Sequence, residues 1–312
     1  MKLVLAFAVV AVLALGAAGG ASARDIDAKG PVVSLATVGV DVAYAVRVRP
    51  SCFEVRVWNT ADRGVRRYAG HCFESTSTGS GVAGVTVSNG RALWLTFTGG
   101  NIREWSLWTK SRTSSAKRIR FVARDVDAAA PIVLGSAWEG SLPYAVDRTI
   151  VVLRPDGARR FALTAQDRVV FVSAHSRGYA AVLADGRVLT ISPTGTVLRE
   201  RPFDPGFVEA AVLAGPGMML KTPEGIEIHD GSSVRELPLP AGSRFLGYAE
   251  GLLAYASGRQ LRLLRVPTAA HTTFRTLPAA GFRAQFGRRG IGYVTDDRVF
   301  FNARTVVGAA AG

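Results

Sequence analysis

The sequence predicts an all-β protein in which seven similar segments each form a four-stranded antiparallel sheet. Three observations support this prediction. The chain has 34 glycines, and short Val- and Leu-rich runs recur from residue 32 to residue 307. Tight-turn sequences such as Asp-Gly and Pro-x-Gly separate these runs. The whole pattern repeats at roughly 40 residues per copy, which is the period of a four-stranded repeat unit.

Residues 169–203, "VVFVSAHSRGYAAVLADGRVLTISPTGTVLRERPF", show the unit most clearly. They contain four β-rich runs: Val169–Ser173, Tyr179–Ala184, Val188–Ser192 and Val197–Phe203. The breaks "HSRG", "DGR" and "PTG" supply residues that favour chain reversal. Four strands joined by tight turns form one antiparallel meander.

The first strands of successive copies begin near residues 32, 82, 131, 169, 208, 244 and 282. Several strands, such as "TIVVL" and "LLAYA", are apolar on both faces. A lone sheet would expose one of those faces, whereas sheets stacked around an axis bury both. We therefore predict a β-propeller of seven four-stranded antiparallel blades, with six or eight blades as alternatives.

The last copy is shortened, which raises the question of how the ring closes. Its third and fourth strands are expected at Val299–Asn302 and Arg304–Val307. The N-terminal sequence "RDIDAKG" is a candidate to complete this blade from the other end of the chain.

The N-terminus has the order of a secretory signal peptide. Lys2 precedes an apolar run, Leu3–Leu15, and small residues then lead to Ala21-Ser22-Ala23. The run is shorter than the about 20 residues of a membrane span. We predict a signal peptide over residues 1–23 and a single propeller domain over 24–312, located outside the cytoplasm. An uncleaved anchor is the alternative.

The two cysteines, Cys52 and Cys72, lie in the third and fourth strands of the first copy. If the chain folds back at Asp62, the two cysteines face each other across an antiparallel pair. In an oxidising compartment they should form a disulfide. A redox pair or a metal site is less consistent with this spacing, since only His71 lies nearby.

The repeats and "PDG"-type turns resemble the β-propeller superfamily, WD40-like in architecture, and in particular its secreted bacterial members. No Trp-Asp pair of the common kind is present, and no specific family is indicated. The resemblance covers residues 32–307 and implies the propeller fold.

The net charge is +14, from 38 Lys and Arg against 24 Asp and Glu. This balance favours anionic partners such as a cell-envelope polymer, but nothing indicates specific nucleic-acid binding. Arginines concentrate in the expected fourth strands, where charge also protects a free sheet edge from association. They are Arg66, Arg67, Arg118, Arg120, Arg159, Arg160, Arg199, Arg201 and Arg235.

Candidate binding residues fall in the turns between first and second strands, which lie on one face of a propeller. A tryptophan among charged groups is typical of recognition surfaces. The candidates are Trp138, Glu139, His175, Arg177, Arg288 and Arg289, with Glu250 in an equivalent turn.

Acidic residues occupy the turns of the opposite face: Asp147, Asp185, Glu224, Asp296 and Asp297. We interpret them as hairpin residues, with a calcium-binding ring as the alternative. The four histidines, His71, His175, His229 and His271, show no metal-binding spacing, so we predict no metal and no cofactor.

The sequence thus favours a secreted, non-catalytic binding or scaffold propeller that recognises an exported protein or a cell-envelope component. It is not expected to be an integral membrane protein. The alternative is a lyase or hydrolase with a site assembled from several blades, in which Glu139, His175 and Arg177 would act as acid, base and oxyanion-binding groups.

Overall fold

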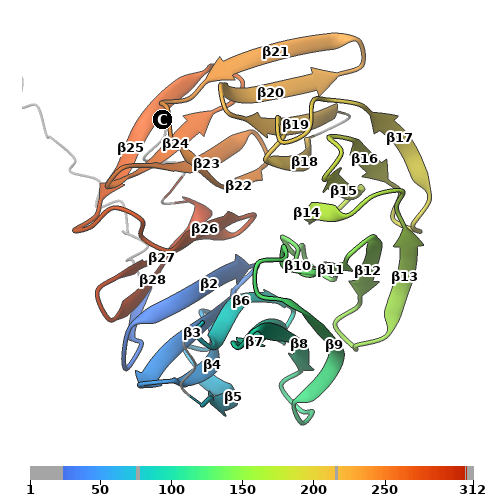
Figure 1. Cartoon of the computed structure of the whole chain (residues 1–312). Helices are drawn as coiled ribbons and strands as arrows, with labels where there is room; N and C mark the ends of the chain where they lie inside the picture. Colours follow the sequence, from blue (N-terminus) through green and yellow to red (C-terminus); the bar gives the residue numbers. More distant parts are fainter. Residues whose placement is uncertain (1–23, 75–77, 215–216, 306, 308–312) are drawn as a thin grey trace, which may run out of the picture.

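The computed structural model describes residues 24–74, 78–214, 217–305 and 307. Seven four-stranded antiparallel sheets stand around a common axis (Figure 1). The predicted seven-bladed β-propeller is therefore confirmed. The predicted signal peptide, residues 1–23, lies outside the described residues.

In each blade the first strand lies at the axis and the fourth at the rim. Blades 1 to 3 consist of β2 (Val32–Val38), β3 (Asp41–Arg49), β4 (Cys52–Asn59) and β5 (Val65–Cys72); β6 (Gly81–Ser88), β7 (Arg91–Thr98), β8 (Ile102–Lys110) and β9 (Lys117–Asp125); and β10 (Ile132–Leu134), β11 (Leu142–Val146), β12 (Thr149–Leu153) and β13 (Arg159–Thr164).

Blades 4 to 6 continue the same plan. They consist of β14 (Val169–His175), β15 (Gly178–Leu183), β16 (Val188–Ile191) and β17 (Val197–Arg201); β18 (Ala210–Ala214), β19 (Gly217–Thr222), β20 (Gly225–Asp230) and β21 (Ser233–Pro238); and β22 (Arg244–Ala249), β23 (Leu252–Ser257), β24 (Gln260–Arg265) and β25 (Ala270–Thr276).

Blade 7 is built from both ends of the chain. It combines β26 (Ala284–Gly287), β27 (Gly290–Thr295) and β28 (Arg298–Ala303) with the N-terminal strand β1 (Arg24–Asp27). The register pairs Arg24 with Phe301 and Asp27 with Arg298. The sequence "RDIDAKG" does complete this blade, as expected.

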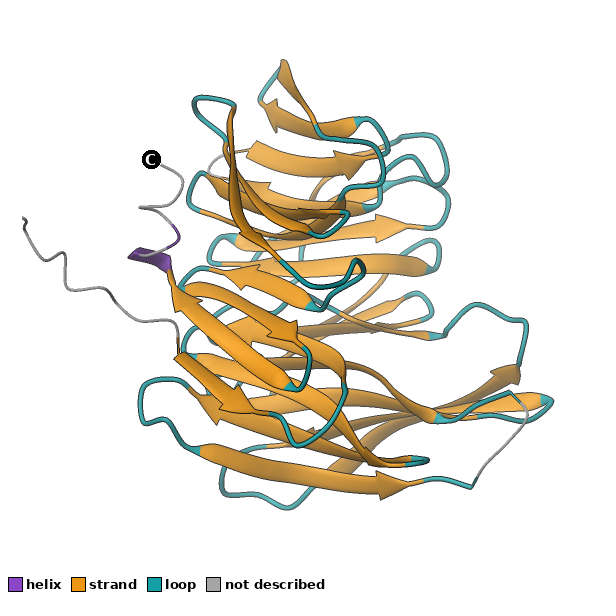
Figure 2. Cartoon of the chain, turned by 90° about the vertical axis from the view of Figure 1, so that its left-hand side faces the viewer, coloured by secondary structure: helices purple, strands orange, loops and turns teal. Residues whose placement is uncertain are grey.

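The prediction of a fourth strand at Arg304–Val307 is wrong. Arg304 and Thr305 lie in a helical turn, drawn in purple in Figure 2. The edge of β28 that this segment would have used is taken by β1, so the chain after β28 has no free strand to pair with.

The hydrophobic core lies between adjacent blades, which is why the inner strands are apolar on both faces. All six residues of β15 are buried, and they divide between two clusters. Tyr179 and Ala181 pack with Ile150 and Val152 of blade 3, whereas Ala180 packs with Leu220 of blade 5. Each joint between blades is thus a separate small core.

The fourth strands of blades 1, 2, 3, 4 and 6 share a bulge, in which two residues face one residue of the third strand. A bulge bends the strand and re-aims a side chain. The extra residues are Tyr68, Ile119, Arg160, Leu198 and Phe274.

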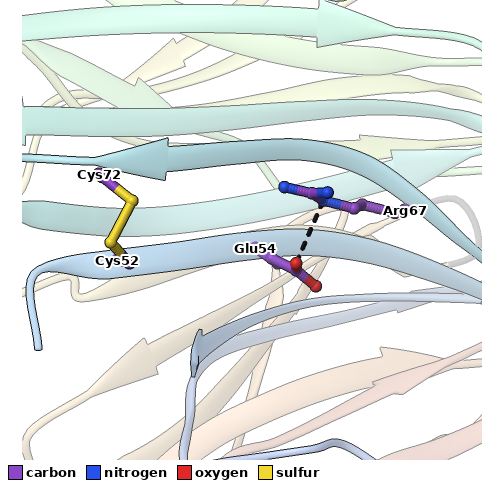
Figure 3. The surroundings of a disulfide bond; sticks show 4 residues. All are labelled: Cys52, Glu54, Arg67 and Cys72. Carbon is purple, nitrogen blue, oxygen red and sulfur yellow. Dashed lines mark ion pairs between the residues drawn. A yellow bond between two sulfur atoms is a disulfide. The ribbon is translucent and has the colours of Figure 1, made fainter. Parts of the chain in front are cut away.

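The two cysteines form the predicted disulfide. Cys52 and Cys72 face each other in the β4–β5 register, with their Cα atoms 4.1 Å apart. On the same hairpin Glu54 forms an ion pair with Arg67 at 3.2 Å (Figure 3). The disulfide pins the outer hairpin of blade 1, next to the blade that closes the ring.

No helix in the described part of the chain is long and apolar enough to cross a bilayer.

Candidate functional site

The turns between first and second strands bring charged residues of three blades together near the axis. Glu139 lies between β10 and β11, Glu250 between β22 and β23, and Arg288 between β26 and β27. Glu250 has a φ of 46°, as the tight reversal at this point requires. These turns lie far apart in the sequence, and only the circular arrangement of the blades makes them neighbours.

Arg288 links the two glutamates. Its Nε donates to Glu250 Oε1 at 2.9 Å and its Nη1 donates to Glu139 Oε2 at 3.4 Å. Arg289 Nε donates to the other Glu139 oxygen at 3.2 Å. Arg304 Nη1 lies 2.9 Å from Glu250 Oε2. Three arginines and two glutamates therefore form one network, which we call the central charge cluster.

Trp138 and His175 form the aromatic part of this face. Their ring centroids are 4.7 Å apart, and both side chains are half-buried. Burial is the main reason that the pKa of His175 lies below its usual value. The nearby charge of Arg177 lowers this pKa further, while Glu250 opposes the shift. His175 is therefore neutral at pH 7.

A small cavity lies beneath these turns, lined by residues of six blades, including Trp138, Glu139 and Arg288. Its volume is about 40 Å³, which is room for a few water molecules. Gln285 Oε1 accepts a hydrogen bond from the Thr37 backbone N at 2.6 Å and so joins blade 7 to blade 1 here. A wider, open groove of about 710 Å³ adjoins it, lined by Glu250, Arg288, Arg289 and Arg304 among others. This face therefore combines a small cavity with a broad open groove.

The sequence reasoning missed two residues of this face. Arg304 was expected in a strand, and the network instead uses it from the helical turn after β28. Ser88, at the end of β6, donates to the Trp138 carbonyl at 2.9 Å and accepts from Gly140 N at 2.9 Å, which fixes the turn that carries Trp138. The only signal for Ser88 in the sequence was its position at the end of the first strand of blade 2.

Five of the six candidate binding residues gather around the central charge cluster, and Arg177 lies apart. It lines a separate cavity of about 460 Å³ between blades 4 and 5, together with Arg199, Arg201 and His229. In this cavity Arg201 Nη1 is 2.5 Å from His229 Nδ1, and His229 Nε2 is 2.8 Å from Glu227.

The alternative enzyme hypothesis requires Glu139, His175 and Arg177 to act as acid, base and oxyanion-binding groups. Glu139 is instead engaged by two guanidinium groups. His175 Nδ1 faces the backbone N of Arg177, at 3.4 Å. Among the described residues, no hydrogen bond joins the Glu139 carboxylate to His175.

The other histidines have structural contacts. His71 Nε2 accepts a hydrogen bond from Trp94 Nε1 at 2.8 Å, across the joint between blades 1 and 2. His271 Nδ1 lies 2.9 Å from the Tyr255 hydroxyl. Burial lowers the pKa of both histidines.

The acidic turns of the opposite face show the geometry of hairpins. Asp147 and Asp296 each have a φ of 50°, the left-handed conformation that two-residue turns require. Asp147 forms an ion pair with Arg124 at 2.6 Å, and Asp185 pairs with Arg187. Within residues 24–74, 78–214, 217–305 and 307, no group of three or more His, Cys, Asp or Glu could hold a metal ion.

Several solved structures share the architecture of this chain. A chain of the Mitotic Checkpoint Complex is 15% identical over 96% of this chain and 99% of that chain, with a TM-score of 0.57. The Neurospora crassa Pan2 WD40 domain is 13% identical, over 87% and 88%, with a TM-score of 0.53. Saccharomyces cerevisiae Sqt1 is 11% identical, over 90% and 97%, with a TM-score of 0.51.

These likenesses show the fold, a seven-bladed β-propeller with WD40-like neighbours. No family model and no curated protein sequence matches the chain.

Proposed function

We propose that the protein is an exported, non-catalytic binding scaffold whose protein partner docks on the face of the central charge cluster. The observation that carries this proposal is the convergence of Trp138, Glu139, Glu250, Arg288 and Arg289 from turns of three blades. A half-buried aromatic group beside hydrogen-bonded charges is typical of the centre of a protein interface.

The shape of the face also favours a protein partner. The cavity beneath it has room for water molecules only, and the groove beside the cluster is broad and open. The surrounding turns present an aromatic ring and both signs of charge. One similar propeller was solved as part of the Mitotic Checkpoint Complex, which supports an assembly role for this architecture.

Two features support export. Residues 1–23 have the order of a signal peptide, and the Cys52–Cys72 disulfide is consistent with an oxidising compartment. N-terminal sequencing of protein recovered outside the cytoplasm should begin at Arg24. A sequence that begins at Met1 would contradict cleavage and favour the uncleaved anchor.

The docking face can be tested by site-specific photo-cross-linking in the organism that makes the protein. A photoreactive amino acid replaces Trp138 in one variant and Glu224, in a turn of the opposite face, in the control. We expect one defined protein adduct from position 138 and none from position 224. Equal adducts from both positions, or an adduct from 224 alone, would overturn the assigned face.

A further inference from the structure

The bulge residues of blades 1, 2 and 6 pack into their joints, whereas the exposed Arg160 of blade 3 and Leu198 of blade 4 do not. In blade 1 the extra residue Tyr68 is buried, and its hydroxyl donates to the Gly90 carbonyl of the next blade at 2.6 Å. Ile119 and Phe274 likewise pack into the joints that follow blades 2 and 6. In blade 4 the extra residue is Leu198, and 64% of it is exposed.

Leu198 therefore does not fill the joint between blades 4 and 5. The opening is the cavity of about 460 Å³, with Leu213 and Met218 of blade 5 along its wall. Since both of these side chains are buried, the wall beside Leu198 is apolar. A cavity of this size can accept a few side chains of a ligand.

Two arginines from different elements line the opening. Arg199 follows Leu198 and lines the cavity with it, and Arg177 reaches the cavity from the turn between β14 and β15. Among the residues that the structure describes, neither guanidinium group has a carboxylate within ion-pair distance. The adjacent Glu200 does not neutralise Arg199, because it pairs with Arg187 at 3.0 Å.

Arg201 is held in place as a third donor. It contacts His229 Nδ1 at 2.5 Å and donates to the Gly231 carbonyl at 3.0 Å. Because an arginine can only donate, His229 Nδ1 is the acceptor in this contact. Asp230 is the one carboxylate that lines the cavity, against three guanidinium groups.

We propose that this groove binds an acidic peptide segment of a partner protein, with an apolar side chain covering Leu198 and carboxylates facing Arg177 and Arg199. An apolar group in the ligand would cover the exposed leucine, and anionic groups beside it would pair with the unneutralised arginines. A uniformly charged polymer would satisfy the arginines and leave Leu198 exposed. The groove lies outside the central charge cluster and is a second contact region beyond the proposed docking face.

The test uses the folded chain and a fluorescent peptide, acetyl-Asp-Asp-Leu-Asp-Asp-amide. Two control peptides replace Asp by Asn or Leu by Ala, and inorganic polyphosphate is the polymer probe. The test variant is Arg177→Gln with Arg199→Gln. The matched control is Arg159→Gln with Arg160→Gln, which removes the same charge from the exposed fourth strand of blade 3.

We expect the groove variant to weaken peptide binding by about tenfold or more, as the loss of two charged hydrogen bonds implies, and the control to stay within about twofold. Leu198→Ala should weaken binding of the Leu peptide and leave the Ala peptide unchanged. Equal losses in the groove variant and the control would overturn the site. Groove-dependent binding of polyphosphate without a preference for Leu would assign the groove to an anionic polymer and overturn the peptide proposal.

Trp138→Ala distinguishes this inference from the proposed function. The variant should lose its partner at the central face and still bind the acidic peptide. If cross-linking at position 138 fails while the groove result stands, the docking face is wrong and the groove is retained; the opposite pattern removes the groove alone.

Discussion

The central charge cluster and the groove between blades 4 and 5 are both rich in arginine, but only one of them has matching carboxylates. At the centre, Glu139 and Glu250 take hydrogen bonds or ion pairs from Arg288, Arg289 and Arg304. In the groove, the arginines meet a histidine, a carbonyl and solvent. The count of basic residues is therefore a poor guide to anion binding, and the position of the nearest carboxylate decides it.

The two regions also differ in what they do for the fold. The central cluster connects turns of three blades and thereby contributes to the closed ring. The groove is a place where the ring is incompletely packed, since Leu198 does not fill the joint as Tyr68 does in blade 1. Substitutions in the central cluster should accordingly lower stability, whereas substitutions in the groove should mainly change binding.

The largest expected effect comes from a site outside both regions. Replacement of Cys52 and Cys72 by alanine should lower the free energy of unfolding by about 3 kcal/mol, because a closed loop of this size restricts the unfolded chain. Chemical denaturation of the oxidised protein and the double variant measures the difference. Peptide binding in the groove should not change under native conditions. A change in binding without a change in stability would show that blade 1 is coupled to the groove.

Removal of the central carboxylates should convert the cluster into a region like the groove. Glu139→Gln with Glu250→Gln leaves three arginines without ionised partners. We expect a loss of about 1–2 kcal/mol in the free energy of unfolding, from several partly exposed ion pairs. A second, salt-sensitive binding event should appear with the acidic peptide, measurable by titration at low and high ionic strength.

The matched control for that variant is Glu236→Gln, a carboxylate on the exposed strand β21. Gain of peptide binding in this control as well would mean that net charge, and not the local match of charges, governs the response.

The smallest expected effect is a dependence of stability on pH that arises from His175 at the central face. The pKa of His175 lies below its usual value, so the unfolded chain takes up its proton first as the pH falls. The stabilisation that neutral His175 contributes is fully present above about pH 6.5, its pKa in the unfolded chain. It is lost as the pH falls from there through the lower pKa of the folded protein.

His175→Phe should remove part of this acid sensitivity, because the new ring can still pack on Trp138 and has no proton to bind. Melting temperatures at pH 7.5 and 5.5 measure the effect in both proteins. His71 and His271 share the direction of shift, so the variant retains some sensitivity. An unchanged pH slope in the variant would contradict the contribution assigned to His175.

Much of the architecture could be predicted because it depends on local signals. The turn sequences and the period of apolar runs identified seven blades, and the chain reversal at Asp62 placed Cys52 opposite Cys72. The position of Arg304 could not be obtained in this way. Whether its segment forms a strand depends on which strand takes the edge of β28, and β1 comes from the far end of the sequence.

The candidate site was predictable as a face and not as a set of contacts. The turn positions placed Trp138 and Glu139 on one side of the propeller. The circular order of the blades placed the equivalent turns of other blades on the same side. The separation of Arg177 from this group could not be predicted. The cavity that Arg177 lines adjoins Leu198, the bulge residue of β17, and a bulge has no signal in the pattern of apolar residues.

The pairing of β1 with β28 has a consequence for how the protein is made. The first strand of the propeller is synthesised almost a whole chain length before the strand that it must join, so the ring cannot close until β28 has emerged. Until then blades 1 to 6 can form one after another, while blade 7 remains incomplete. A factor that holds residues 24–27 after synthesis would therefore keep the ring open, and its release would allow the final step of folding.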